Sequence, residues 1–482
     1  MPSGQARART KILLLDPPTF PKGGLSLSLP AVAACLRDVC DVRIVDLNFV
    51  PAEEYREVLE RGDAPQVCGL KVSAQNLPLA VELSALARAA HPDIQIVWGG
   101  ELPTLLPDEC LKTADSVVQG RFEPQAAAFL ADLAAGKLAR IYRAEQAASF
   151  NGSPPPALDL VENPGRYLQF MGTPVESALG CGEACTFCLV HMMQGKTDYR
   201  GMDALAEDLR VNRRRFVNVV DYNIGSRKEH LLAAARTLGE SSVAGWMGEC
   251  CLETLDDAEV LEALHASRCR IMYCGLESLS PAALKTVNKT QNKVDSYRRI
   301  IRRAQAHGIE IATGFILGLS GTERSSFVEF ADFCEEVGII ALKLTWLTFN
   351  PGARIHKSMR TKGRYISEKL SDFDGNHLTF VPEGVRQEEL FAGARELIRR
   401  FYSPLAAWRR SRHLAGALRR RAEFMLFSHC YGQAYRDWLR CGVLQPSGGG
   451  FDRLLRAPLR KGFPLRLAER LLGGLREGAG CR

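Results

Sequence analysis

Two series of short apolar segments alternate with helix-length segments along this chain. Apolar runs of this length, each followed by a helical pattern, predict parallel strands joined by helices, which is an α/β fold. The expected strands of the first series are Lys11–Asp16, Val42–Asp46, Val67–Val72, Ile94–Gly100 and Asp115–Gly120. We therefore predict a doubly wound parallel sheet over residues 1–150. A proline-rich stretch, Asn151–Pro156, then opens a linker over residues 151–172.

The second series predicts a different arrangement of the same units. Its expected strands are Pro174–Leu179, Phe216–Tyr222, Gly245–Leu252, Arg270–Gly275, Glu310–Leu317 and Ala341–Phe349. Six strand–helix units of this size predict a partial (βα)6 barrel over residues 173–355. Beyond it the pattern becomes helical and basic over residues 356–482. From Arg399 onward, 18 Lys and Arg stand against 5 Asp and Glu.

Composition narrows the class of protein. With 46% hydrophobic and 24% charged residues, the chain of 482 residues is globular rather than disordered. No apolar run reaches the roughly 18 residues of a membrane span, and no apolar secretory segment is evident, so we expect a cytoplasmic protein. Fifteen cysteines in such a protein favour metal binding or catalysis over a disulfide framework.

Three of these cysteines form a motif directly after the first expected strand of the second series. Cys181, Cys185 and Cys188 are spaced as CxxxCxxC. Thiolates at this spacing can converge on one side of a tight loop, hold three irons of a [4Fe–4S] cluster and leave the fourth iron open. Zinc is the alternative metal, for which His191 is the one nearby candidate as fourth ligand. Three buried free cysteines are the purely structural interpretation.

With Phe187 before the third cysteine, this loop resembles the signature of the radical S-adenosylmethionine (SAM) enzymes. Further matches follow in the order of that superfamily: Gly275–Ser278 (GLES), Gly314–Gly318 (GFILG) and Asn350–Gly352. The resemblance implies SAM contacts at Phe187, Tyr222, Asn223, Glu277, Ser278, Gly314 and Gly318. The second strand departs from the superfamily, because it ends in Asp221-Tyr222-Asn223 instead of a GGE-like segment.

The first series resembles the Rossmann-like cobalamin-binding domain that precedes many radical SAM barrels. The resemblance implies that cobalamin is lined by residues at strand ends, namely Pro17, Ser73, Gly99, Gly100, Glu101 and Gly120. The DxHxxG loop that coordinates cobalt in cobalamin-dependent mutases is missing from the sequence. His91, the one histidine before residue 191, precedes Pro92 at an expected helix end. Cobalamin is therefore expected base-off, without a histidine ligand.

Together the two resemblances imply a cobalamin-dependent radical SAM enzyme of the methylase type. Such an enzyme methylates an unactivated carbon of a lipid or natural-product intermediate through a 5′-deoxyadenosyl radical and methylcobalamin. The same cofactors also serve oxidative cyclisation, ring contraction and other rearrangements, which stay open as alternatives. An alternative of another class is a non-catalytic cobalamin or iron–sulfur sensor. We expect an electron donor such as flavodoxin or ferredoxin, a small-molecule or lipid substrate and no nucleic acid, and no catalytic side chain is assigned.

Three features have more than one interpretation. Leu454–Leu475 interleaves Leu and Phe with Arg, which is typical of a helix on a membrane surface or of a solvated cap. Nucleic-acid contact is a further alternative, although no recognised RNA-binding module accompanies this segment. Cys250 and Cys251 are either hydrogen donors at the active site or small buried hydrophobic residues, and burial is favoured. For Tyr222 and Trp246, a place in the core is favoured over substrate contact.

Overall fold

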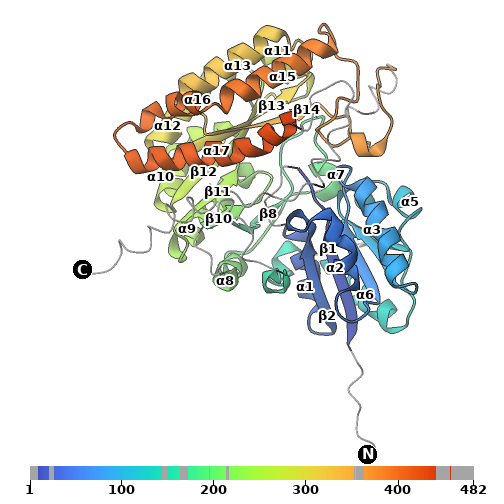
Figure 1. Ribbon diagram of the computed structural model, residues 1–482. Coiled ribbons are helices and arrows are strands. Elements are labelled where there is room, and N and C mark those ends of the chain that lie inside the picture. Colours follow the sequence, from blue (N-terminus) through green and yellow to red (C-terminus); the bar gives the residue numbers. More distant parts are fainter. Residues whose placement is uncertain are drawn as a thin grey trace, which may run out of the picture. The chain divides into compact units, whose positions relative to one another are not determined.

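The computed structural model describes residues 9–20, 26–143, 149–162, 172–194, 196–212, 216–351, 353, 356, 363–440 and 456. The chain divides into two compact units, one of residues 1–167 with 455–459, the other of residues 168–454 with 460–482. Each unit contains its own parallel sheet (Figure 1). Among the described residues, no helix combines the length and the apolar character needed to cross a membrane.

The first unit is built on a six-stranded parallel sheet. Its strands are β1 (Thr10–Asp16), β2 (Cys40–Asp46), β3 (Val67–Lys71), β4 (Gln95–Gly99), β5 (Ser116–Gln119) and β6 (Ile141–Arg143), in the order β2-β1-β3-β4-β5-β6. The first five have the 2-1-3-4-5 order of doubly wound folds, which confirms the predicted fold class. The edge strand β6 was not predicted. It has three residues, and Tyr142 is its one buried side chain.

Helices cover both faces of this first sheet. On one face α2 (Tyr55–Glu60) and α3 (Leu77–Ala90) pack against Leu13 and Leu15, and on the other α1 (Ser28–Leu36) and α6 (Ala126–Ala134) pack against Ile12 and Leu14. Two short helices, α4 (Glu101–Leu105) and α5 (Pro107–Cys110), follow β4. Because successive side chains of a strand point to opposite faces, a strand that is buried on both faces has a run of consecutive apolar residues, as β1 has in Ile12–Leu15.

The second unit contains an open six-stranded parallel sheet, as predicted. The order is β14-β13-β12-β11-β10-β7, with β7 (Thr173–Val175), β10 (Phe216–Val219), β11 (Gly245–Glu249), β12 (Cys269–Glu277), β13 (Glu310–Leu317) and β14 (Ala341–Trp346). The expected strand Pro174–Leu179 is wrong as one element. It divides into β7 and β8 (Ala178–Leu179), and β8 pairs with β9 (Asp198–Tyr199). The division occurs because the backbone N–H groups of Ser177 and Ala178 donate to the Asp221 carboxylate.

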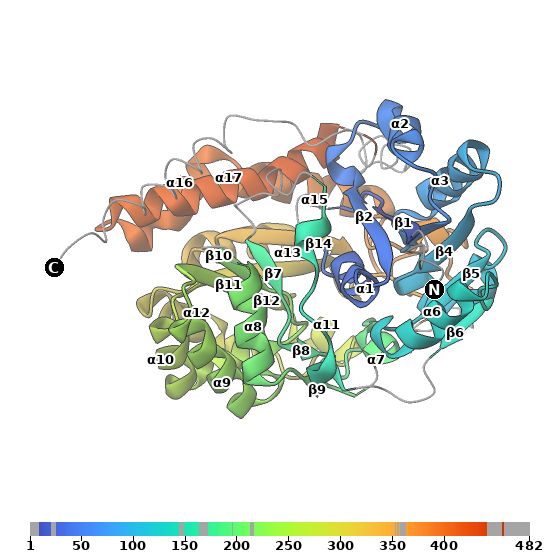
Figure 2. The same cartoon turned by 90° about the horizontal axis from the view of Figure 1, so that it is seen from below.

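One face of the second sheet carries the helices of the strand–helix units (Figure 2). These are α8 (Met202–Asn212), α9 (Lys228–Glu240), α10 (Ala258–Ala266), α12 (Tyr297–Ala306) and α13 (Arg324–Val337), with the short α7 (Val190–Gln194) and α11 (Pro281–Thr286) near the strand ends. Phe315 of β13 illustrates this packing, because its ring contacts Phe327 and Phe330 of α13. This face is the outer surface of the partial barrel.

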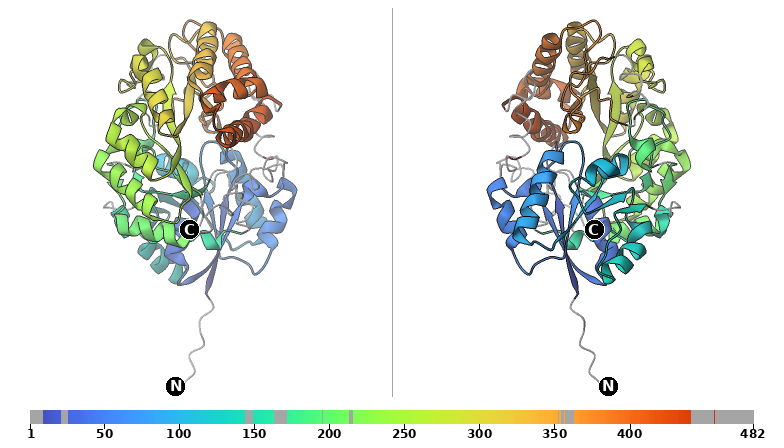
Figure 3. Two further views of the ribbon diagram at one scale, coloured as in Figure 1. Left: turned by 90° about the vertical axis from the view of Figure 1, so that its left-hand side faces the viewer. Right: turned by 90° about the vertical axis from the view of Figure 1, so that its right-hand side faces the viewer.

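Three further helices pack together against the edge and inner face of the partial barrel (Figure 3). They are α15 (Gln387–Phe401), α16 (Pro404–Arg410) and α17 (Leu418–Arg440), which confirms the helical C-terminal pattern over residues 387–440. Within residues 363–386 the prediction is wrong, because the short 3-10 helix Leu370–Asp372 is the one helical element there. The Tyr402 and Tyr435 hydroxyls accept hydrogen bonds from the backbone N–H groups of Leu342 and Leu344 on β14, at 3.0 and 2.8 Å. These tyrosines therefore satisfy donors of an edge strand that no further strand pairs among the described residues.

Candidate functional site

The cysteine motif lies on the loop between β8 and α7. Cys185 is buried, whereas Cys181 and Cys188 are half-buried. Burial raises the pKa of the Cys185 and Cys188 thiols, and the neighbouring thiols of the motif raise both further. The three thiols are thus close enough to interact electrostatically. Within the described part of the chain, however, no three Cys, His, Asp or Glu side chains are gathered tightly enough to hold a metal ion.

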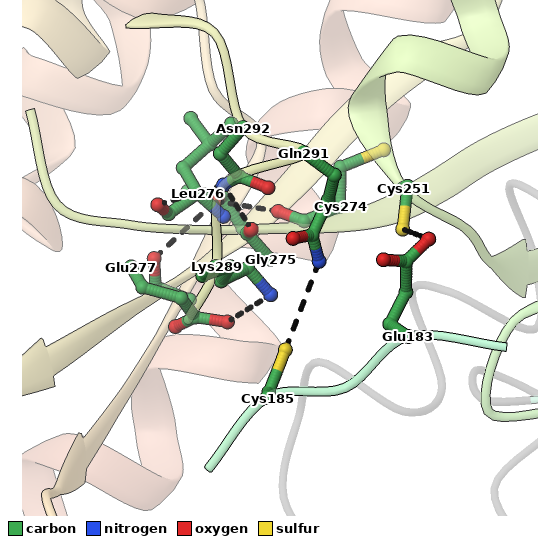
Figure 4. Close-up of polar contacts among 12 residues, drawn as sticks. Glu183, Cys185, Cys251, Cys274, Gly275, Leu276, Glu277, Lys289, Gln291 and Asn292 are labelled. Atoms are coloured by element: carbon green, nitrogen blue, oxygen red, sulfur yellow. Dashed lines mark hydrogen bonds and ion pairs between the residues drawn. The ribbon is translucent and has the colours of Figure 1, made fainter. Parts of the chain in front are cut away.

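A second loop holds the cysteine loop in place. The Thr186 N–H donates to the Val287 carbonyl at 3.0 Å, and Asn288 Nδ2 donates to the Ala184 carbonyl at 2.9 Å. From the same loop, Gln291 Nε2 contacts Cys185 Sγ at 3.7 Å (Figure 4). The segment of residues 287–292 therefore fixes the backbone on which the thiols are carried.

Glu277 ends β12 in a strained backbone conformation. Its φ is +66°, a left-handed value that non-glycine residues rarely adopt. The pairing of β12 with β13 shifts register between Cys274 and Glu277. Thr313 Oγ1 stabilises this bulge, because it accepts from the Leu276 N–H at 3.2 Å and donates to the Cys274 carbonyl at 2.7 Å. Strain of this kind persists where the surroundings over-determine a conformation, which is typical of functional sites.

The Glu277 carboxylate pairs with Lys289, which lies beside the cysteine loop (Figure 4). Lys289 Nζ is 3.4 Å from Glu277 Oε1, and each side chain is 12% exposed. Lys289 also lowers the pKa of Cys185 and Cys188, opposing the effect of burial. The pair thus places a carboxylate and an ammonium next to the thiols.

Two glycines provide the space that Glu277 occupies. A Cβ on Gly314 would come within 2.8 Å of Glu277 Oε2 and 2.5 Å of the Tyr273 hydroxyl, and a Cβ on Gly275 would overlap Glu277 Oε1. Larger residues at either position would displace the carboxylate. Gly318 has a φ of +84°, and a Cβ there would lie 3.0 Å from the Phe380 ring.

Two residues at this site were not identified from the sequence. Lys289 supplies the cation, and Asn292 Nδ2 donates to the Gly275 and Leu276 carbonyls at 2.9 and 3.1 Å. The Asn292 Oδ1 atom is buried and has no hydrogen-bond partner among the described residues. Both belong to a polar stretch, Asn288–Asn292 (NKTQN), that follows α11. A run of five polar residues placed 11 to 15 positions after a strand-end carboxylate is the signal that could have indicated them.

The remaining residues predicted to contact SAM lie on separate segments of the chain. Phe187 is half-buried on the cysteine loop, and the Ser278 hydroxyl accepts from the Ser280 N–H at 3.0 Å. Asn223 is buried, and its side chain accepts from the Gly225 N–H at 3.1 Å. Tyr222 is 41% exposed, so the favoured core position is wrong for it. For Trp246 the core position is confirmed, because the ring is fully buried.

Asp221 is buried at the end of β10, where the sequence departs from the superfamily pattern. Its buried carboxylate accepts from the N–H groups of Ser177 at 2.6 Å and Ala178 at 3.0 Å, and from the Ser177 hydroxyl. Burial raises its pKa to about 6. The Ser177 hydroxyl also contacts His230 Nε2 at 3.1 Å, and burial lowers the pKa of His230 to about 4. Asp221 thus orients the chain into the cysteine loop.

The adjacent cysteines at the end of β11 have different surroundings. Cys250 is buried, and its Sγ is 3.9 Å from the Sγ of Cys274, which agrees with the favoured interpretation. Cys251 is half-buried, so the favoured interpretation is wrong for it. Its thiol contacts Glu183 Oε1 of the cysteine loop at 3.7 Å (Figure 4). The same thiol lies 3.6 Å from Asn223 Nδ2.

In the first unit, the predicted cobalamin residues share the carboxyl edge of the sheet. Hydrogen bonds link them: the Ser73 N–H donates to Asn76 Oδ1, Asn76 Nδ2 donates to the Pro17 carbonyl, and Thr104 Oγ1 connects the Gly100 carbonyl to the Gly120 N–H. Gly100 has a φ of +112°, and a Cβ there would come within 2.8 Å of the Val72 carbonyl. Gly99 ends β4, and Glu101 begins α4.

His91 lies away from this edge. It follows the last residue of α3, a helix that connects β3 to β4 and therefore ends at the amino edge of the sheet. Its Nε2 atom is 3.0 Å from the Leu59 carbonyl. Apart from Arg456, the interleaved segment Leu454–Leu475 lies outside the described residues, as does Gly352 of the turn after β14.

Comparison with known protein families places two domains on these units. The model of the B12 binding domain matches residues 21–130, and the model of the Radical SAM superfamily matches residues 175–334. The chain is 25% identical to the bacteriochlorophyllide d C-12(1)-methyltransferase of Chlorobaculum tepidum, over 85% of this chain and 91% of that protein. It is 26% identical to the hopanoid C-2 methylase of Rhodopseudomonas palustris, over 79% and 72% respectively.

A solved structure shows the same fold. The radical SAM methyltransferase TsrM from Kitasatospora setae, solved with cobalamin and a [4Fe–4S] cluster bound, matches with a TM-score of 0.66 and 14% identity, over 87% of this chain and 99% of that one. The predicted pair of domains is therefore confirmed. The chain therefore contains a B12 binding domain followed by a radical SAM domain, and the relatives that it resembles over most of its length are methyltransferases.

Proposed function

We propose that this enzyme transfers a methyl group to an unactivated carbon of a small-molecule lipid or natural-product intermediate. One observation supports the position of its reaction centre most strongly. Glu277 is held in a left-handed conformation at a strand end, paired with Lys289 and next to the loop that carries three cysteines. When bound, the cluster, SAM and cobalamin supply a substrate radical and the methyl group that it receives.

The donor set of the cysteine loop fits an iron–sulfur cluster. Cys181, Cys185 and Cys188 provide three thiols, and the fourth iron would stay open for SAM. Because burial raises the pKa of the Cys185 and Cys188 thiols, they are protonated near neutral pH, and metal binding must release those protons. Lys289 favours the thiolate form and so assists this release.

SAM fits the groups that surround the cysteine loop. Glu277 would accept hydrogen bonds from the ribose hydroxyls, and Lys289 would pair with the methionine carboxylate, because it is a buried cation beside the loop. Gly314 and Gly318 would leave room for close backbone approach. Phe187, Asn223, Ser278 and Tyr222 are the further candidates from the sequence.

Cobalamin fits the carboxyl edge of the first sheet. Pro17, Ser73, Gly99, Gly100, Glu101 and Gly120 meet there at the ends of neighbouring strands, where α/β sheets bind their ligands. His91 lies at the opposite edge, so we propose a base-off cobalamin without a histidine ligand. The domain limits proposed for this architecture are residues 1–150, 151–172, 173–355 and 356–482.

The proposal is tested anaerobically with the full chain. The protein is reconstituted with iron, sulfide and hydroxocobalamin and desalted, and SAM and a reductant such as reduced flavodoxin are then added. We expect retained cobalt, methylcobalamin, S-adenosylhomocysteine and 5′-deoxyadenosine. Cys185→Ala should abolish 5′-deoxyadenosine formation, whereas Cys35→Ala in the first unit is the matched control. An iron–sulfur spectrum without retained cobalt would refute the methyl-transfer mechanism.

Product mass separates methylation from the alternatives. A gain of one methyl group identifies a methyltransferase, whereas loss of hydrogen alone identifies an oxidative cyclisation or contraction, and a new product of unchanged mass identifies a rearrangement with the same cofactors. A protein that never cleaves SAM under reducing conditions would be a sensor. We propose a cytoplasmic location and a flavodoxin or ferredoxin as electron donor. Fractionation of cells would show whether the basic tail adds peripheral membrane contact.

A further inference from the structure

The inner face of the second sheet changes from apolar to charged along the strands. Met247, Ile271, Ala312 and Ala341 form an apolar row on four neighbouring strands, packed against Phe424 and Phe427 of α17. Because alternate residues of a strand share a face, the next residues on this face lie two positions further along. They are Glu249, Tyr273, Gly314 and Lys343, and we call them the polar row. Strand pairing places Glu249 opposite Tyr273 and Gly314 opposite Lys343. Between β12 and β13 the register is offset, so that Tyr273 lies opposite Ala312 and only its hydroxyl reaches Gly314.

The two charged side chains of the polar row have no direct partner among the described residues. Neither Glu249 nor Lys343 makes a hydrogen bond or ion pair there. The Glu249 side chain is accessible to solvent. Protein atoms around its carboxylate partly desolvate it and raise its pKa, whereas Lys343 lowers that pKa. Lys343 is half-buried. Its ammonium contacts no anion directly among the described residues, so it is available to pair with an anionic group of a ligand.

The polar row lies next to the proposed SAM site. The Tyr273 hydroxyl and Glu277 Oε2 both approach the Gly314 backbone, at 2.5 and 2.8 Å from where a Cβ would stand. Burial raises the pKa of Tyr273 well above its ordinary value, and Glu277 and Glu249 raise it further. Tyr273 therefore keeps its proton and is available as a hydrogen-bond donor.

We infer that Lys343 and Tyr273 bind a carboxylate of the substrate, while Glu249 accepts a hydrogen bond from a neighbouring donor group. The inference rests on the proposed function and adds the chemical class of its substrate. A neutral hydrocarbon would leave both charges of the polar row unpaired. A phosphate dianion would carry one more negative charge than Lys343 can balance, whereas a singly charged carboxylate matches one ammonium and one hydroxyl.

The test compares a carboxylic acid with its own ester on the reconstituted enzyme. The probes are bacteriochlorophyllide d, the compound named for a relative of this chain, and its methyl ester, in which the carboxylate charge is removed. Dissociation constants are measured from probe absorbance with SAM present. We expect the acid to bind at least about tenfold more tightly than the ester, the usual scale of a contact with a charged group.

Variants then assign that preference to a residue. Lys343→Met should bind acid and ester equally, and Lys343→Arg should keep the preference for the acid. Lys285→Met, on the exposed surface of α11, is the matched control and should also keep the preference. The cluster spectrum of each variant shows that it has folded and reconstituted.

Four outcomes would overturn the inference. They are failure of the acid to bind, equal binding of acid and ester by the unaltered enzyme, an acid preference that survives in Lys343→Met, and a loss of SAM affinity in Lys343→Met. The last result, measured by calorimetry, would reassign Lys343 to the SAM site. Methylcobalamin and 5′-deoxyadenosine formation are measured without either probe. Their absence would refute the proposed function, whichever probe binds.

Discussion

The Glu277–Lys289 ion pair is the interaction whose removal tests the proposed site most directly. Both side chains are almost fully buried, and their charged atoms are 3.4 Å apart. Burial alone would lower the pKa of Lys289, but the summed attraction of Glu277, Cys185 and Cys251 raises it above its ordinary value. Lys289 is therefore protonated and charged, and the charge of each partner is balanced mainly by the charge of the other.

The size of the effect follows from this burial. Removing one partner of a buried ion pair leaves an uncompensated charge and typically costs about 3–5 kcal/mol, whereas replacing both partners costs much less. We expect Lys289→Met to lower the free energy of unfolding by about 3 kcal/mol, because Glu277 would then be buried without a cation. The double variant E277Q/K289M should recover part of that loss, with a coupling energy of about 2 kcal/mol.

Urea unfolding of the cluster-free protein, followed by tryptophan fluorescence, measures these energies. Four of the five tryptophans, Trp246, Trp346, Trp408 and Trp438, lie in the second unit, so the signal follows mainly that unit. The exposed ion pair Glu207–Arg210 on α8 is the matched control and should show no measurable coupling. Additive effects of E277Q and K289M would refute the argument, because independent side chains do not form the pair that the site requires.

Three further predictions concern the surroundings of the site. Tyr435→Phe should lower the unfolding free energy by about 1–3 kcal/mol in urea titrations, because the Leu344 N–H loses its acceptor. Burial lowers the folded-state pKa of His230 from 6.5 to about 4. The contribution of neutral His230 to the free energy of unfolding is therefore fully present above pH 6.5 and is lost as the pH falls toward 4. The stability difference between wild type and His230→Gln should therefore shift by up to about 3 kcal/mol across that interval. In calorimetry, Gly314→Ala should weaken SAM binding by about tenfold or more, because its Cβ would displace the Tyr273 hydroxyl and the nearby carboxylate; unchanged affinity would place SAM elsewhere.

The positions of most strands were predictable from the sequence because they depend on local patterns. The strands of the first sheet are buried on both faces, so each is a short apolar run, and its ends are marked by turn residues such as Pro17 and Gly120. The strand-end glutamate of the GLES segment was predictable for the same reason. The family resemblance then predicted that this glutamate, Glu277, contacts SAM.

The partners of Glu277 were not predictable in this way. Lys289 and Asn292 occupy a polar segment with neither helical nor strand periodicity, and such segments are usually solvated turns. Their role depends on how that segment folds back onto the cysteine loop, a long-range contact that no local pattern encodes. The same holds for Tyr402 and Tyr435, which bond to β14 across 60 and 91 positions of sequence.

Errors in strand length mark the functional edge of the second sheet. Three strands were predicted to end at Tyr222, Leu252 and Phe349. In the structure each leaves the hydrogen-bonded ladder three residues before its predicted end. The residues beyond the ladder include buried side chains, such as Leu252 and Phe349, so their pattern still indicates a strand although the backbone has diverged. In the first sheet β1 and β2 end where predicted, and β3, β4 and β5 stop only one residue early. The larger divergence arises where β10 and β11 give way to Asn223 and Cys251 beside the cysteine loop, so local preference and final structure disagree at the edge that carries the chemistry.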